Sequence, residues 1–218
     1  MGKVKKVLVV QPHSDDALFS CAHALLQDDF QATVLTVEND PVRVKEDIAL
    51  FNLLEIPYKH LNVEFKDESY YGYFKRYKTV NHDDAIEYLK EYYGETKLEE
   101  IHDAIQMYVK KFKKDNPDYK IIAPLGISHP FHYFVHLCLK HFADYFYREF
   151  PHSYKKRSKK QMDETLQSYK LYQSVETREI HDLKFDLAKK FYKSQSGLLF
   201  YERGYIEKQL AEEIYVQK

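Results

Sequence analysis

The stretch VVQPHSDDALFS, residues 9–20, joins two apolar segments of different period. The run VLVV that leads into it, residues 7–10, is apolar throughout, which is typical of a strand buried on both faces of a sheet. After the two acids the apolar residues recur at helical spacing between Leu18 and Leu26. A histidine and two acids therefore stand where a buried strand is expected to give way to a helix.

Strand and helix patterns alternate along the first part of the chain. Apolar strands are expected at residues 32–37, 58–65 and 120–125, and a helix with an apolar stripe is expected at residues 41–56. Strands that alternate with helices predict a parallel sheet with right-handed crossovers. We therefore expect an α/β protein, a Rossmann-like three-layer sandwich with a mostly parallel sheet.

The remaining segments give weaker patterns. Residues 67–93 are rich in tyrosine, and we expect an irregular excursion from the sheet there. Helical patterns at residues 180–195 and 205–215 predict two helices in the last third of the chain. The sequence has no repeat, linker or low-complexity segment, so residues 1–218 are expected to form a single domain.

Composition narrows the class of protein. Hydrophobic residues make up 44% of the chain and charged residues 31%, which fits a soluble globular protein. The formal net charge of −1 argues against a general nucleic-acid-binding protein, because such proteins usually carry a basic excess. No apolar run reaches the length of about 20 residues that a membrane span needs. Cys21 and Cys138 are expected to be buried thiols, so we expect a cytoplasmic protein with no membrane span.

Two histidine-bearing loops follow expected strands. PHSDDA, residues 12–17, follows the first strand, and GISHPFH, residues 126–132, follows the strand at 120–125. Ligands of open α/β sheets bind outside the carboxyl ends of the strands. Both loops are therefore expected to contribute to one site.

The residue types in these loops suit a metal-dependent hydrolase. His13 and Asp16 can reach one ion together, and a histidine of the second loop would complete three protein ligands and leave one position for water. Such an ion lowers the pKa of its water toward about 7. Asp15 could then deprotonate the water as a general base, and a second histidine could stabilise an oxyanion or protonate a leaving group.

Simpler interpretations compete with these roles. Asp15 or Asp16 could be a helix N-cap, although a cap does not account for the neighbouring histidine. Arg43 could bind a substrate hydroxyl or phosphate, or lie on the surface. Tyr70 and Tyr73 could stack on a sugar ring over the pocket, or they could pack in the core or in a mobile lid.

PHSDDA resembles the P-H-x-D-D signature of the PIG-L/LmbE-like deacetylases, a family of zinc-dependent N-acetylglucosaminyl deacetylases. GISHPFH is similar to the H-x-D-H loop of that family. Three later segments resemble further family elements in the same order, namely RVKEDIALFNLL, FYREFPHSY and KKFYKSQ. The resemblance covers roughly residues 4–200.

The resemblance implies an LmbE-like fold and a role for each polar residue of the two loops. The zinc ligands would be His13, Asp16 and His132, and Asp15 would be the general base. His129 would stabilise the oxyanion and assist departure of the amine. The implied reaction is hydrolysis of an N-acetyl group, commonly on an amino sugar. Because histidine and aspartate ligands do not select zinc uniquely, Fe²⁺, Co²⁺ or another divalent ion could serve.

The chain departs from the family pattern in CAHAL, which replaces a small, glycine-rich start to the first helix, in REFPHSY, which lacks the usual acid, and at Phe131. Phe131 stands where the family has an aspartate beside the equivalent of His129. Two alternatives to a deacetylase of a small N-acylated amino sugar therefore stay open. The chain could be an inactive relative that binds a metabolite or partner through the same crevice, or an amidase acting on a non-sugar amide. The sequence also leaves open whether copies of the chain form a homo-oligomer.

Overall fold

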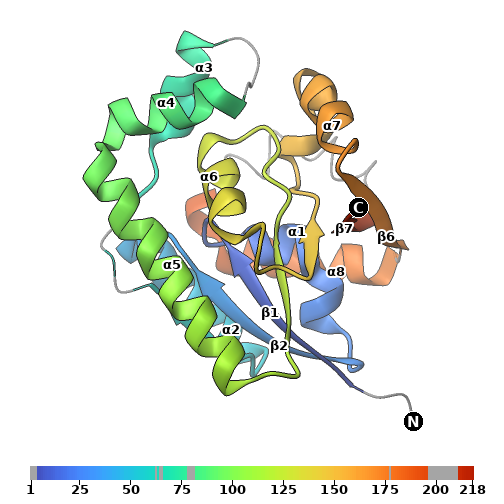
Figure 1. Cartoon of the computed structure of the whole chain (residues 1–218). Coiled ribbons are helices and arrows are strands. Elements are labelled where there is room, and N and C mark those ends of the chain that lie inside the picture. Colours follow the sequence, from blue (N-terminus) through green and yellow to red (C-terminus); the bar gives the residue numbers. More distant parts are fainter. Residues whose placement is uncertain (1–3, 62, 64–65, 78–81, 177, 196–210) are drawn as a thin grey trace.

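The chain folds around a seven-stranded sheet (Figure 1). The computed structural model describes residues 4–61, 63, 66–77, 82–176, 178–195 and 211–218. Within these residues the strand order is β3-β2-β1-β4-β5-β7-β6. The strands are β1 Lys5–Gln11, β2 Phe30–Thr36, β3 Tyr58–His60, β4 Lys120–Pro124, β5 Tyr145–Tyr147, β6 Tyr169–Glu176 and β7 Ala211–Gln217.

Most neighbouring strands of this sheet are parallel. The strand β1 pairs in parallel with β2 and with β4, and the parallel arrangement continues to β3 on one side and β5 on the other. The strand β7 pairs antiparallel with both β5 and β6. The predicted α/β class with a mostly parallel sheet is therefore confirmed.

Helices cover both faces of the sheet. In β1, Val7 and Val9 lie in one apolar core with residues of α1, α2 and α8, whereas Leu8 and Val10 lie in another with residues of α4, α5 and α6. Helices on both faces agree with the expected Rossmann-like sandwich (Figure 1). No helix in the described ranges is long and apolar enough to cross a membrane. The helices are α1 Asp16–Leu26, α2 Pro41–Leu53, α3 Ser69–Arg76, α4 His82–Tyr93, α5 Glu95–Asp115, α6 Pro130–Leu139, α7 Lys159–Thr165 and α8 Arg178–Phe191.

Most of the described residues of the tyrosine-rich segment 67–93 are helical, so the expectation that the segment is irregular was wrong. The segment forms α3 and α4, with residues 78–81 outside the described part. Tyr73 and Tyr88 pack together in a small buried core between the two helices. A Cβ atom at Gly72 would collide with the Tyr88 hydroxyl, so glycine leaves the space that the end of the Tyr88 side chain fills.

The C-terminal segment corrects a second expectation. The helix expected at 180–195 is present as α8. The helix expected at 205–215 is not, because residues 211–217 form the strand β7 and residues 205–210 lie outside the described part. The strand β6 was not expected at all. Together β6 and β7 extend the parallel sheet by an antiparallel pair at its far edge.

Candidate metal centre

The turn between β1 and α1 holds the first loop in a strained shape. Asp15, at the N-cap position of α1, has φ 106° and ψ −30°, a conformation that side-chain-bearing residues rarely adopt. Its side chain makes no capping hydrogen bond, which counts against the simple N-cap interpretation. Asp16 instead closes the turn, because its Oδ2 accepts from the backbone N–H of His13 at 2.8 Å. Strain of this kind costs about 1–3 kcal/mol and is typical of functional sites.

A buried hydrogen-bond network centred on Gln11 holds this turn in place. Gln11, the last residue of β1, accepts through Oε1 from the backbone N–H of Ala17 at 2.9 Å. Its Nε2 donates to Thr36 Oγ1 at 2.7 Å and to Asp47 Oδ2 at 3.0 Å. The side-chain oxygen and the amide nitrogen of Gln11 are therefore both used, and the start of α1 is anchored to β2 and α2.

The second loop lies between β4 and α6. Ser128 has φ 65°, and its backbone N–H donates to Gln161 Oε1 at 2.7 Å. His129 is the N-cap of α6, where its Nδ1 accepts from the backbone N–H of Phe131. Pro130 opens the helix, as is common at the first helical position. His132 follows on the first turn of α6 and is fully buried.

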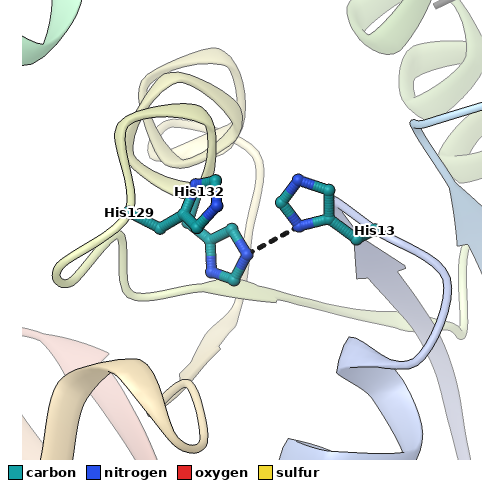
Figure 2. A group of neighbouring side chains, drawn as sticks. All are labelled: His13, His129 and His132. Atoms are coloured by element: carbon teal, nitrogen blue, oxygen red, sulfur yellow. Dashed lines mark hydrogen bonds between the residues drawn. The ribbon is translucent and has the colours of Figure 1, made fainter. Parts of the chain in front are cut away.

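The two loops bring three donor atoms together. His13 Nδ1 lies 2.9 Å from His132 Nε2, and Asp16 Oδ2 lies 3.3 Å from each of these two nitrogens. Figure 2 shows the two histidine rings facing each other across the gap between the loops. In a tetrahedral zinc site with bonds of about 2.0–2.1 Å, donor atoms lie about 3.3 Å apart. The spacing of these three atoms therefore suits a single metal ion.

His129 lies next to this triangle. One ligand atom each from His13, His129 and His132 falls within a group no wider than 4.8 Å, and all three residues are buried. The ring of His129 stacks on that of His132, with centroids 4.5 Å apart (Figure 2). The geometry accordingly allows two ligand sets, the three histidines or His13 and His132 with Asp16.

The two adjacent aspartates have opposite electrostatic environments. Burial raises the pKa of Asp15 well above its usual range. Burial alone would also raise the pKa of Asp16. The charge of His132 and the hydrogen bond with His13 outweigh burial and hold the pKa of Asp16 well below its usual range. For His13, burial opposes protonation, yet hydrogen bonds with Asp16 and Asp67 raise its pKa to about 10. Neighbouring carboxyl groups whose pKa values are driven apart are suited to different roles.

The second ring nitrogen of His132, Nδ1, is placed as expected when a histidine binds a metal through Nε2. Its Nδ1 is buried and has no hydrogen-bond partner among the described residues, while Glu149 Oε1 lies 3.8 Å away. A histidine that binds a metal through one ring nitrogen usually keeps a proton on the other and directs it at a carboxylate. Imidazole and carboxylate ligands suit Zn²⁺ and other first-row divalent ions. The residues present therefore fit a divalent ion at this position.

A cavity of about 150 Å³ opens over these residues. Asp15 and His129 line it together with His13 and Asp16, so the two predicted catalytic residues share this cavity with two of the three predicted ligands. Arg43 and Tyr70 line it too, and Arg43 Nη1 donates to Glu38 Oε2 at 2.7 Å. Tyr73 does not line it. That residue is fully buried in the small core with Tyr88, so we drop it as a substrate-binding residue.

Four further residues of the site were not predicted from the sequence. Glu38 and Glu149 are buried acids just beyond the ends of β2 and β5, where the same strand-end rule could have found them. His152 lies with its ring centroid 5.1 Å from that of His129, at the wall of the cavity. Asp67 precedes α3 and contacts His13. Nothing in the sequence near Asp67 marks it as part of a site, whereas His152 lies in FYREFPHSY, one of the segments that resemble a family element.

We compared the chain with models of known protein families, with curated proteins and with solved structures, and none of them matches it. The class of protein is therefore stated from the fold and the site alone. The chain is an α/β protein with a buried group of three histidines that could hold a metal ion. The resemblance to the PIG-L/LmbE-like deacetylases stays a hypothesis that rests on the two loops and the three later segments of the sequence.

Proposed function

We propose that this chain is a metal-dependent hydrolase that removes an N-acetyl or other N-acyl group, most simply from an amino sugar. The observation that carries the proposal is the convergence of His13 Nδ1, Asp16 Oδ2 and His132 Nε2 within 2.9–3.3 Å of one another, next to a cavity that Asp15 lines together with His13 and Asp16. The resemblance of both loops to the deacetylase motifs supports the reaction class. His13, Asp16 and His132 would hold Zn²⁺, Fe²⁺ or another divalent ion.

A divalent ion bound there would lower the pKa of its water toward about 7 and polarise the acyl carbonyl. Asp15 faces the cavity and would accept the proton that the attacking water gives up. His129 would donate a hydrogen bond to the oxyanion that forms from the carbonyl and assist departure of the amine, which would take up the proton that Asp15 had accepted. The products are a free carboxylate and a free amine, so water is the co-substrate.

Arg43 and Tyr70 would contact the rest of the substrate. The guanidinium of Arg43 is held in place by Glu38, and its remaining N–H groups suit a substrate hydroxyl or phosphate. The ring of Tyr70 stacks on His129 at a centroid distance of 4.7 Å, which places an aromatic face at the cavity wall. Aromatic faces of this kind suit the apolar face of a sugar ring.

The decisive experiment is an assay of carboxylate release by the purified chain. The protein would be stripped with a chelator, reloaded with Zn²⁺, Fe²⁺ or Co²⁺, and given N-acetylglucosamine conjugates and a non-sugar N-acetyl amide as parallel substrates. We expect acetate release that needs the metal and is absent in Asp15→Ala. A metal-loaded chain that releases no acetate from either substrate class would count against the proposal.

One observation favours a second candidate, a metal-binding protein without hydrolase activity. Phe131 is fully buried and its side chain has no polar atom that could orient His129. In that case the chain would bind one equivalent of metal and bind acylated ligands without cleaving them. Metal content and turnover, measured on the same preparation, separate the two candidates.

A further inference from the structure

Asp67 is a buried carboxylate at the edge of the candidate metal centre. It lies in the segment between β3 and α3, and its side chain is 1% exposed. Its Oδ2 lies 2.9 Å from His13 Nε2 and 3.8 Å from His129 Nε2. One oxygen of Asp67 therefore faces both a proposed ligand and a proposed catalytic residue.

The other contacts of Asp67 hold this carboxylate in a fixed orientation. Its Oδ1 accepts from the Tyr93 hydroxyl at 2.6 Å and from the backbone N–H of Ser69 at 2.9 Å. Its own backbone N–H donates to Glu38 Oε1 at 3.1 Å. The carboxylate is thus anchored to α4 and to the start of α3, and the backbone of Asp67 is anchored to the acid that follows β2. A group held on all these sides cannot turn away from His13 without breaking buried hydrogen bonds.

His13 uses its two ring nitrogens in different directions. Nδ1 faces His132 and Asp16, and Nε2 faces Asp67. A carboxylate that accepts from one ring nitrogen fixes the proton there and leaves the lone pair of the other nitrogen free for a metal. With the proton on Nε2, His13 can bind a metal only through Nδ1, which is the nitrogen that belongs to the donor triangle.

The proximity of the same oxygen to His129 gives Asp67 a second contact in the cavity. Phe131, two positions after His129, cannot accept a hydrogen bond through its side chain. Asp67 is the carboxylate that the described residues place within 4 Å of a ring nitrogen of His129. It arrives from a segment more than 60 positions earlier in the chain.

We propose that Asp67 is the positioning residue of the site, which orients His13 as an Nδ1 ligand and keeps His129 facing the cavity. The inference rests on the proposed metal site, and it adds a residue that neither loop contains. Asp67 is not itself a ligand in this proposal, because its Oδ2 contacts the ring nitrogen of His13 that points away from the donor triangle.

The test measures zinc affinity in four variants by competition with a chromophoric chelator, with Zn²⁺ alone as the probe. Loss of a carboxylate behind a metal-bound histidine typically weakens metal binding about 10–100-fold. We expect a loss of that size in Asp67→Ala, and a smaller loss in Asp67→Asn, which keeps an acceptor oxygen. Of the three variants at the site, Tyr93→Phe, which removes one donor to Asp67 Oδ1, should lose least. Asp163→Asn, at an exposed acid paired with Lys159, makes the same charge change as Asp67→Asn and should bind zinc like the wild type.

A spectroscopic measurement separates positioning from a general effect on folding. In the metal-free wild type, the Nε2 proton of His13 should give a downfield imidazole resonance in ¹H–¹⁵N spectra. That resonance should disappear in Asp67→Ala and persist in Asp163→Asn. Thermal unfolding of each metal-free variant shows which of them fold. If Asp67→Ala does not fold, the zinc affinity and the spectrum of Asp67→Asn test the positioning role instead.

The outcomes that overturn the inference differ from those that overturn the proposed function. A wild-type chain that binds no divalent ion removes the metal site and this inference with it. A wild type that binds zinc, beside Asp67 variants with unchanged affinity, overturns the inference alone. Complete loss of zinc in Asp67→Asn, equal to that in His132→Ala, also overturns it, because Asp67 would then be a ligand.

Discussion

His13 Nδ1 lies 2.9 Å from His132 Nε2 although 119 positions separate the two residues in the chain. The sheet explains this proximity. The strands β1 and β4 are parallel neighbours, with Val7 paired to Lys120, so their carboxyl ends meet at one edge of the sheet. Each histidine follows one of these ends. The site is therefore a consequence of strand order, and the residues that complete it come from other elements at the same edge.

The ligand set can be decided by single substitutions. The donor triangle predicts that Asp16→Ala and His132→Ala lose tight zinc binding, whereas His129→Ala keeps it. The physical reason is that Asp16 Oδ2 lies within 3.3 Å of both facing nitrogens. Metal content after dialysis and calorimetric titration would measure this. His102→Ala, at a histidine of α5 with a 42% exposed side chain, is the control. Zinc retained in Asp16→Ala but lost in His129→Ala would instead support a three-histidine site.

Asp15 should be needed for turnover and not for metal binding. Asp15→Asn removes the proton acceptor but keeps a residue type that tolerates positive φ, so the turn at φ 106° should survive. Loss of a general base typically lowers the rate about 10²–10⁴-fold. We expect kcat to fall by that factor while the zinc affinity changes little. Steady-state kinetics of acetate release and a zinc titration on one preparation test both parts, and kcat equal to that of the wild type would remove Asp15 from the mechanism.

The parallel part of the fold was predictable because its strands are buried on both faces. In β1 the residues Val7 to Val10 are all apolar and all buried, so the sequence signal is continuous. The strand β7 has no such signal, because Glu212 occupies a buried position in it. A buried acid breaks the apolar alternation by which a strand is recognised, and AEEIY then resembles a helix. Lys184, whose Nζ donates to Glu212 and compensates the buried charge, lies on α8. The sequence around Glu212 therefore gives no sign of this partner.

The candidate site was predictable to the extent that its residues cluster in sequence. His13 and Asp16 share one loop, and His129 and His132 share the other. Asp67 stands alone among polar residues, and only the folded chain brings it to His13. The tyrosines of α3 were not distinguishable from the sequence, because Tyr70 and Tyr73 lie close together in one helix but only Tyr70 lines the cavity.

Tyr70 and Tyr73 should therefore respond differently to truncation. Tyr70 lines the cavity, so Tyr70→Ala should raise KM for an N-acetyl sugar with a small change in stability. Tyr73 is fully buried, and Tyr73→Ala should lower the free energy of unfolding by about 3–5 kcal/mol, as for other large buried aromatic residues. Urea unfolding and steady-state kinetics measure the two effects. Tyr92→Ala, at a 48% exposed ring of α4, is the control. If KM for the sugar is unchanged in Tyr70→Ala, the stacking role is wrong.

Glu212 predicts how the stability of the fold depends on pH. Its Oε2 accepts from the backbone N–H and from Nδ1 of His23, and its Oε1 accepts from Lys184 Nζ at 2.8 Å. Burial opposes ionisation, but the charge of Lys184 and the hydrogen bonds from His23 outweigh it and lower the pKa of Glu212 to about 2.

Because the folded-state pKa lies below the unfolded value of 4.5, this stabilisation is present above about pH 4.5 and is lost as the pH falls toward 2. Its size is about 3 kcal/mol. Glu212→Gln should therefore be less stable than the wild type at pH 7, and the difference should shrink toward pH 2. Urea unfolding between pH 7 and pH 2 measures it, with Glu164→Gln, at a 55% exposed acid, as the control. Since protonation in the wild type and substitution in the variant remove the same charge, a stability difference that stays constant over this range would mean that the carboxylate of Glu212 is not the group that titrates.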